Sequence, residues 1–338
     1  MLLLMRRLPG LCLILLLAVG TVAAEESQKP SHPVLGTGRG LDHVGILVTN
    51  LAEAGAVFAK RLGFTIDAGG KLPFGTENAT IDFADESFLE LIAITDRATA
   101  LQRKPGLVRF LDRGEGGAFA VLDVSSAQRA FETLTRRGQR LITPRHVAMT
   151  YPGVAEAAPG WTSLFFESPP FPADPLFFIE YDPWREFQER HPEFKPDTRH
   201  PNGALRLRAA WMAVTNIQKA TDAWRSMEFK LGSRISLPFL KAQGRRVIAG
   251  AGDVLVVSPI RERGPVAAFL ERHEGGIVGV TIEVQELRAT EACLRANLGS
   301  SVHRMAGAFG PAILLEPSVT HGVWIEFVER VVGGRVER

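Results

Sequence analysis

The sequence has very few cysteines, no excess of either charge and little continuous apolar sequence after its first residues. Its 338 residues include only two cysteines, and Cys12 belongs to the N-terminal apolar run. Without that run, Cys293 is the one cysteine left, which excludes an internal disulfide. We expect Cys293 to be a small core residue of a helix and not a nucleophile. A chain of this length can bury a sufficient core without disulfides.

The balance of charges argues against highly charged partners. The chain has 39 basic and 37 acidic residues, and residues 1–24 hold two of the basic ones and no acidic one, which leaves 37 of each. Nucleic acids and anionic membranes select basic surfaces. The sequence also has no glycine-rich nucleotide motif, nucleophile elbow or CxxC pair. We therefore expect a small-molecule substrate or ligand, no nucleic acid, no membrane once the leader is removed, and a monomer or homodimer.

The first residues have the pattern of a targeting segment. Arg6 and Arg7 precede the apolar run 11–19, and the small residues 22–24 follow it. This order predicts a secretory signal peptide over residues 1–24, and hence a secreted or periplasmic protein. An uncleaved N-terminal anchor is the alternative. No later segment is long and apolar enough for a transmembrane helix.

One short pattern recurs along the rest of the chain. Val48-Thr49-Asn50 ends an aliphatic stretch ahead of an amphipathic helix, and Val214-Thr215-Asn216 opens a similar unit. In three copies, corresponding positions of the first and last strands lie 47 residues apart. These positions are 43 and 90, 209 and 256, and 279 and 326. A fixed period indicates a fold built from copies of one unit.

Each copy has the order strand, helix and three further strands, and the chain holds four of them. The second copy is the most divergent and has a Pro- and Gly-bearing insertion at 149–160. Neighbouring copies are expected to pair, because consecutive elements are usually adjacent in space. The predicted organisation is an N-terminal linker at 25–40, modules 1 and 2 at 41–182, a linker at 183–204, and degenerate modules 3 and 4 at 205–330.

This βαβββ order resembles the vicinal oxygen chelate superfamily, which includes glyoxalase I, extradiol dioxygenases and bleomycin-resistance proteins. The first copy resembles its glyoxalase-like domains most closely, and the last two copies share mainly the pattern. The resemblance implies an α+β fold of four βαβββ modules that form two paired, half-open barrel-like sheets, with one divalent metal ion (Zn, Ni, Mn or Fe). The segments that carry it are Leu41-Asp42-His43-Val44, Leu62-Gly63-Phe64, Phe74-Gly75-Thr76-Glu77-Asn78 and Leu89-Glu90-Leu91-Ile92.

His43 and Glu90 are the first two predicted metal ligands. Each lies in a strand of the first copy, and Glu90 is embedded in an apolar run, where a carboxylate must be neutralised. Nitrogen and oxygen donors suit a divalent metal. A core histidine hydrogen-bonded to a carboxylate explains the spacing better when spacing is the only argument. The resemblance reverses that preference, because its first- and last-strand ligands fall on these residues.

The third ligand is expected from the second copy. The segment Pro175–Tyr181 is similar to the last strand of the first copy, so Glu180 is predicted to bind the metal and to act as a catalytic carboxylate. A strand-end carboxylate that faces water is the alternative. Phe119 aligns with His43 and cannot bind a metal. If module 1 paired with module 4 instead, Glu326 would replace Glu180.

Three further residues are predicted to bind substrate. Asn78 is a candidate hydrogen-bonding residue, since the resemblance places it on the third strand, and Thr76 precedes it in the same segment. Trp161 could line an apolar pocket. A turn at residues 75–78 and ordinary core packing of Trp161 are the alternatives.

The function implied by these features is redox-neutral chemistry on a small molecule. Export separates the protein from the main glutathione pool, which argues against glyoxalase I. One histidine and two carboxylates depart from the two-histidine, one-carboxylate set of oxygen-activating iron. We therefore expect a metal-dependent lyase, isomerase or hydrolase that chelates a small oxygenated metabolite through adjacent oxygens. The alternatives are a metal-free protein that binds or sequesters a small molecule, and a ring-cleaving dioxygenase.

Overall fold

The computed structural model of the chain describes residues 31–149, 154 and 156–331. The predicted signal peptide at 1–24 and part of the predicted insertion at 149–160 lie outside these residues. Within them, the strands form one two-stranded and one sixteen-stranded sheet. No helix in this part of the chain has the length and apolarity needed to cross a membrane.

The first module has the predicted order of strand, helix and three strands. Its helix begins after Asn50, whose side chain accepts a hydrogen bond from the Glu53 amide at 3.1 Å, as the capping-box spacing indicates. The helix ends in a π-helical turn. Its elements are β3 (Leu41–Leu47), α1 (Leu51–Ala56), η1 (Val57–Arg61), β4 (Asp67–Leu72), β5 (Thr76–Asp82) and β6 (Phe88–Ile94).

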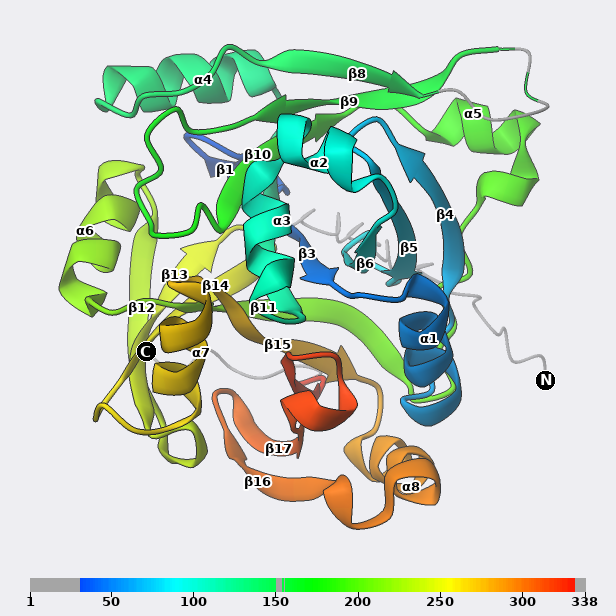
Figure 1. The fold of residues 1–338 in the computed structure, drawn as a ribbon, viewed down its shortest axis with the longest axis vertical. Coiled ribbons are helices and arrows are strands. Elements are labelled where there is room, and N and C mark those ends of the chain that lie inside the picture. Colours follow the sequence, from blue (N-terminus) through cyan, green and yellow to red (C-terminus); the bar gives the residue numbers. More distant parts are fainter. Residues whose placement is uncertain (1–30, 150–153, 155, 332–338) are drawn as a thin grey trace, which may run out of the picture.

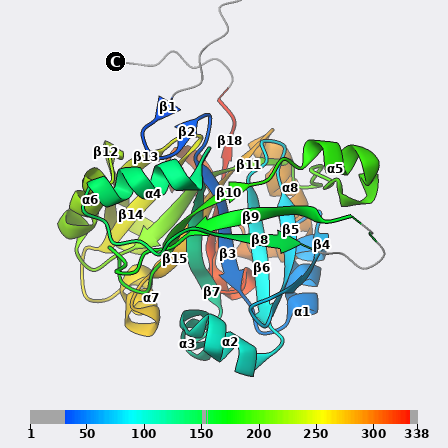
Figure 2. The same cartoon turned by 90° about the horizontal axis from the view of Figure 1, so that it is seen from above.

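Two helices that the sequence pattern did not predict join the first and second modules. They are α2 (Arg97–Arg103) and α3 (Pro105–Asp112). Figures 1 and 2 show α3 beside α7, a helix of the second half of the chain, and Phe110 of α3 stacks on His273 of α7 at 4.1 Å. The second module then consists of β7 (Gly116–Asp123), α4 (Ala127–Arg136), β8 (Arg145–Met149), β9 (Ala158–Leu164) and β10 (Leu176–Tyr181).

The first two modules pair through their first strands. β3 runs antiparallel to β7, and the strand order of this half is β4-β5-β6-β3-β7-β10-β9-β8. Neighbouring modules are therefore adjacent, as predicted. The outermost strands of this half do not pair with each other, so the sheet is curved but open. The predicted fold class is confirmed.

The predicted linker at 183–204 contains a short helix, and the remaining two modules follow it. Their first strands, β11 and β15, pair antiparallel, and β15 also pairs with β7 at Ile277 and Gly117, which continues the sheet from one half into the other. A small hairpin of β1 (Ser31–His32) and β2 (Gly36–Thr37) precedes the first module. The other elements are α5 (Arg185–Arg190), η2 (Pro192–Phe194), β11 (Ala204–Ala213), α6 (Ile217–Ser226), β12 (Lys230–Leu237), η3 (Pro238–Leu240), β13 (Ala242–Ala249), β14 (Gly252–Pro259), α7 (Pro265–His273), β15 (Gly276–Val284), α8 (Leu287–Leu298), η4 (Gly299–Ser301), β16 (His303–Gly307), β17 (Gly310–Leu315), η5 (Pro317–Val319) and β18 (Trp324–Glu329).

The inner faces of the two halves of the sheet differ in whether side chains fill the space beside them. Alternate residues of the first strands, such as Val44 in β3 and Ala210 in β11, belong to one apolar core that both halves share. The opposite face of β11 carries Trp211, which packs with Phe239 and Trp324 in a second cluster. The inner face of the second half is thus filled by packed apolar side chains, including first-half residues such as Leu47 and Phe110, whereas that of the first half lines a cavity.

Candidate functional site

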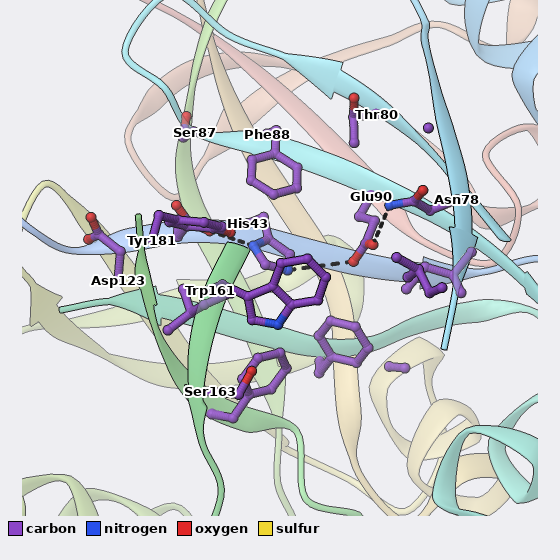
Figure 3. A pocket seen from close by; sticks show the side chains of 18 of the residues that line it. His43, Asn78, Thr80, Ser87, Phe88, Glu90, Asp123, Trp161, Ser163 and Tyr181 are labelled. Carbon is purple, nitrogen blue, oxygen red and sulfur yellow. Dashed lines mark hydrogen bonds and ion pairs between the residues drawn. The ribbon is translucent and has the colours of Figure 1, made fainter. Parts of the chain in front are cut away.

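The inner face of the first half is the wall of a large cavity. The cavity has a volume of about 2740 Å³ and is lined from β3, β5, β6, β7, β9 and β10. Thr76, Asn78 and Trp161 all line it, so the three predicted substrate-binding residues share one cavity with His43 and Glu90. Their contact with a substrate stays a prediction. Figure 3 shows the side chains of Asn78, Trp161 and Glu90 around the His43 imidazole.

His43 is buried and held from two sides. Only 4% of the residue is exposed, and its ring stacks on Phe88 with centroids 4.3 Å apart. Its Nδ1 lies 2.5 Å from Oδ2 of Asp42. Nδ1–H donates to this carboxylate, which leaves Nε2 as the ring nitrogen directed toward Glu90, 3.5 Å from Oε2. Asp42 therefore fixes both the tautomer and the orientation of the ring.

Asp42 reaches His43 because the strand is irregular at this point. Adjacent residues of a regular strand point to opposite faces. The pairing of β3 with β7 shifts register between Leu41 and His43, which is a β-bulge at Asp42. Bulges re-aim side chains and are common beside active sites. The sequence contains Asp42-His43 as neighbours, yet strand alternation alone places them on opposite faces, and Asp42 was not predicted as a site residue.

Tyr181 completes the support of Asp42 from the second module. Its hydroxyl donates to Oδ2 of Asp42 at 2.9 Å. Burial, together with the charge of Asp42, raises the pKa of Tyr181 well above its usual value. The phenol therefore remains a donor across the physiological range. Tyr181 was not predicted either, because its partner lies 139 residues away in the sequence.

Glu90 is the other polar group at the centre of the cavity. Its Oε1 accepts a hydrogen bond from Nδ2 of Asn78 at 2.8 Å, and Oδ1 of Asn78 accepts one from the Gly70 amide at 2.9 Å. The dashed lines of Figure 3 follow this contact and the one to His43. The Asn78 amide thus positions the carboxylate. A continuous chain of polar contacts runs from Tyr181 through Asp42, His43 and Glu90 to Asn78.

The prediction that Glu180 is a metal ligand and catalytic carboxylate is wrong. Its Oε2 accepts a hydrogen bond from the Ala127 amide at 2.8 Å, at the start of α4 and on the face of β10 away from the cavity. Strand register explains the error. Glu90 pairs with Gly45 in β3, and in the second module the corresponding residue of β7, Val121, pairs with Phe177. Glu180 lies three residues beyond Phe177 and so points to the other face.

The residues of the cavity do not fit a divalent metal. The family positions that would supply ligands from the second module hold Phe119 and Phe177, which have no donor atom. At the family's ligand positions, His43 and Glu90 are the two remaining donors, whereas a catalytic zinc has three protein ligands. Within residues 31–149, 154 and 156–331, no group of three His, Cys, Asp or Glu side chains is placed to hold an ion. The Asp42–His43 contact resembles the outer-shell carboxylate of metal sites, but it also orients a catalytic base.

Glu326, the alternative third ligand, has a different environment. It is fully buried in the second half, outside the residues that line the cavity. Its carboxylate accepts hydrogen bonds from the Thr281 hydroxyl at 2.6 Å and from the Ala308 amide at 2.8 Å. Burial raises the pKa of Glu326. These contacts satisfy the carboxylate within its own half of the chain.

Comparison with known proteins identifies the fold and the family. A family model described as a glyoxalase-like domain matches residues 41–228. No curated protein matches in sequence. A hypothetical protein from Staphylococcus aureus has a similar structure with a TM-score of 0.53 at 11% identity, covering 86% of this chain and 98% of that one.

Two enzymes in the solved structures share the fold over most of this chain. A mutant of 4-hydroxymandelate synthase from Streptomyces coelicolor has a TM-score of 0.56 at 12% identity, covering 86% of this chain and 93% of its own. A xylose isomerase-like TIM barrel/4-hydroxyphenylpyruvate dioxygenase fusion protein has a TM-score of 0.54 at 13% identity, covering 91% of this chain and 51% of its own. The family match spans more than half of the chain, and the module order agrees with it. The chain therefore belongs to the glyoxalase-like domain family of the vicinal oxygen chelate superfamily.

Proposed function

We propose that the chain binds a small oxygenated metabolite in the cavity of its first half and moves a proton on it, as a lyase or isomerase. The observation that carries the proposal is the buried contact chain from Tyr181 through Asp42 to His43, beside Glu90. A histidine oriented by a buried carboxylate is the usual arrangement of a general base. The predicted leader at residues 1–24 supports a periplasmic or secreted location for this activity.

In this proposal each polar residue has a distinct task. His43 Nε2 accepts a proton from a carbon next to a carbonyl and returns it. Asp42 stabilises the imidazolium that forms, and Tyr181 holds Asp42 in place. Glu90, oriented by Asn78, is the second proton carrier, 3.5 Å from Nε2. None of these steps requires a metal, in line with the two phenylalanines at the family's ligand positions.

The aromatic wall of the cavity supports binding of an apolar body. Phe119 and Phe177 contact each other with ring centroids 5.3 Å apart, and their centroids lie 6.2 and 6.3 Å from that of the His43 ring. Hydrophobic and aromatic side chains form most of the lining of small-molecule sites, with a few polar groups for orientation. The same wall also suits a protein that only sequesters a ligand, which is the second candidate function.

The test is solvent deuterium incorporation. Purified protein, treated with a chelator, is incubated in D₂O with dicarbonyl and hydroxy-carbonyl compounds, and exchange next to the carbonyl is followed by NMR. We expect exchange in the wild type, and a loss of about 100-fold or more in His43→Ala, since a general base contributes about 10²- to 10⁴-fold. Glu180→Gln is the matched control, because Glu180 lies outside the cavity and should leave exchange unchanged.

Each of the other possible results favours a different hypothesis about the function. Undiminished exchange in His43→Ala would refute the role of His43. Exchange that appears only after Zn, Ni, Mn or Fe(II) is added, with one metal bound per chain by elemental analysis, would restore the metal-dependent reading. Tight binding of an apolar ligand without exchange under any condition would establish the sequestering protein.

A further inference from the structure

An ammonium group lies on the aromatic wall of the cavity without a polar partner. Lys104 links α2 to α3 and lines the cavity. Its Nζ lies 3.8 Å from the centre of the Phe165 ring and 5.0 Å from that of Phe74. No hydrogen bond or ion pair of this ammonium occurs among the residues that the structure describes, and the charge of Asp174 acts on it from farther away.

The surroundings of Lys104 hold its half-buried side chain in the cavity. Its backbone amide donates to the Ala100 carbonyl at 2.8 Å, and Pro105 starts α3 directly after it. The cation–π contacts fix the end of the side chain. Ala173 and Asp174, which border the same cavity, both have positive φ, at 63° and 50°. Consecutive strained residues of this kind occur preferentially at ligand sites.

A continuous row of rings connects Lys104 to the polar centre of the cavity. Phe165 lies against Phe177 with centroids 4.8 Å apart, and Phe177 lies 6.3 Å from the His43 ring. The ammonium and the imidazole therefore stand at two ends of one aromatic surface. A molecule bound along this surface would place an apolar body on the rings, a charged end at Lys104 and a reacting end at His43.

We propose that Lys104 binds the carboxylate of an amphiphilic substrate, and that the substrate class is small carboxylic acids with an apolar or aryl body. This rests on the proposed function for the reacting end at His43, but it assigns a separate subsite. A half-buried ammonium on an aromatic wall, without a hydrogen-bond acceptor, is matched by an anionic oxygen. Asp174, on the same side of the cavity, favours a single negative charge over a dianion such as a phosphate monoester, because like charges repel.

The test compares ligands that differ only in the charged end. The probes are 4-phenylbutyrate, its neutral amide and 4-phenylbutyl phosphate, and binding is measured by calorimetry and ligand-observed NMR. A charge-assisted hydrogen bond corresponds to roughly a tenfold or greater difference in affinity. We expect wild type to bind the carboxylate about tenfold tighter than the amide, and tighter than the phosphate.

Variants assign the preference to Lys104. Lys104→Met should lose the preference for the carboxylate and bind the amide as well as wild type does, whereas Lys104→Arg should keep the preference. Lys60→Met, which removes an exposed lysine outside the cavity lining, is the control for net charge and should behave as wild type.

The outcomes separate this proposal from that of the general base. A wild type that binds acid and amide equally, or a Lys104→Met variant that retains the preference, would overturn the carboxylate subsite even if His43-dependent exchange is observed. Stronger, Lys104-dependent binding of the phosphate would overturn the choice of a carboxylate. A carboxylate preference that depends on Lys104 without any deuterium exchange would keep the subsite and reject the catalytic role.

Discussion

Replacing Lys104 by methionine should stabilise the fold at neutral pH. Burial lowers the pKa of Lys104 to about 8, and the charge of Asp174 only partly opposes this effect. The ammonium form is therefore less favourable in the folded chain than in the unfolded chain, where the pKa is near 10.5. A residue that destabilises the fold while lining a cavity is a candidate for a functional role.

The size of the gain in stability follows from the shift in the pKa of Lys104. Each pKa unit corresponds to about 1.4 kcal/mol, so a shift in the pKa of Lys104 from 10.5 to about 8 corresponds to an upper limit between about 3 and 4 kcal/mol. Asp174 loses its nearby cation in the variant, which offsets part of the gain. Burial already raises the pKa of Asp174 to about 6. We therefore expect Lys104→Met to gain roughly 1 to 2 kcal/mol at pH 7.

The direction of this stability change also predicts how the free energy of unfolding depends on pH. Below pH 8 both states bind the proton, and the wild type carries the full penalty. Between pH 8 and 10.5 the unfolded chain binds more protons than the folded chain, so the free energy of unfolding contributed by Lys104 rises with pH. Lys104→Met should lack this rise.

Urea unfolding midpoints and melting temperatures of wild type, Lys104→Met and the control Lys60→Met would measure this at pH 7, 8.5 and 10. The variant's advantage should be largest at pH 7 and shrink toward pH 10, while Lys60→Met should follow the wild type. A Lys104→Met variant that is less stable than wild type at pH 7, or one with the same pH dependence, would refute the reasoning about the buried ammonium.

The remaining predictions concern register, a helix terminus and a buried acid. The double substitution Phe119→His and Phe177→Glu should create a site for about one equivalent of Zn²⁺, measured by calorimetry and elemental analysis, because these positions face His43 and Glu90; binding no tighter than wild type would contradict the register. Glu180→Gln should lower stability by about 0.5 to 1 kcal/mol, since its charge lies at the start of α4, and should leave binding of the butyrate probe unchanged. Burial raises the pKa of Asp82 to about 6. The stability of wild type should therefore fall by up to roughly 3 kcal/mol between pH 4 and 7, relative to that of Asp82→Asn. Melting temperatures of the two proteins that change in parallel with pH would argue against this.

The module order could be predicted from the sequence because it rests on strong local signals. Asn50 and Asn216 cap the helices of their modules through the amides three residues on, and both follow the Val-Thr-Asn pattern. The first and fourth modules, which share the period of 47 residues, also share one register: Glu326 of β18 pairs with Thr281 of β15, and Glu90 of β6 pairs with Gly45 of β3. The joining helices α2 and α3 carry no such repeat, and so neither they nor Lys104 could be anticipated.

The residues that the first module contributes to the site could be predicted from the sequence. Those of the second module could not, for a structural reason. His43 and Glu90 stand out because a polar residue in an apolar strand has few explanations. In β10 both faces are apolar, with Phe178 toward the shared core and Phe177 toward the cavity, so alternation gives no signal for which face is which. The glutamate of that strand was therefore assigned to the wrong face. A shift of one residue in register reverses every side chain of a strand.

The third module shows the same sensitivity to register. By the period, Val256 is the equivalent of Glu90. In the structure Trp211, the equivalent of Gly45, pairs with Leu255, and Val256 belongs to the core that the two halves share. Bulges in the pairing of β11 with β15 accompany this offset. A repeat in the sequence thus fixes the order of elements more reliably than the face on which a given residue lies.

The two phenylalanines of the second module account for both the loss of metal ligands and the shape of the proposed site. A donor at Phe119 or Phe177 would direct the chemistry to an ion held beside His43 and Glu90. With phenyl rings there, the same positions form the middle of the aromatic row between Lys104 and His43. The same two phenylalanines thus lack metal-binding atoms and extend the aromatic row to the ammonium of Lys104. The double substitution to histidine and glutamate should accordingly gain the metal and lose affinity for 4-phenylbutyrate, and a variant that gained the metal without losing the acid would separate the two.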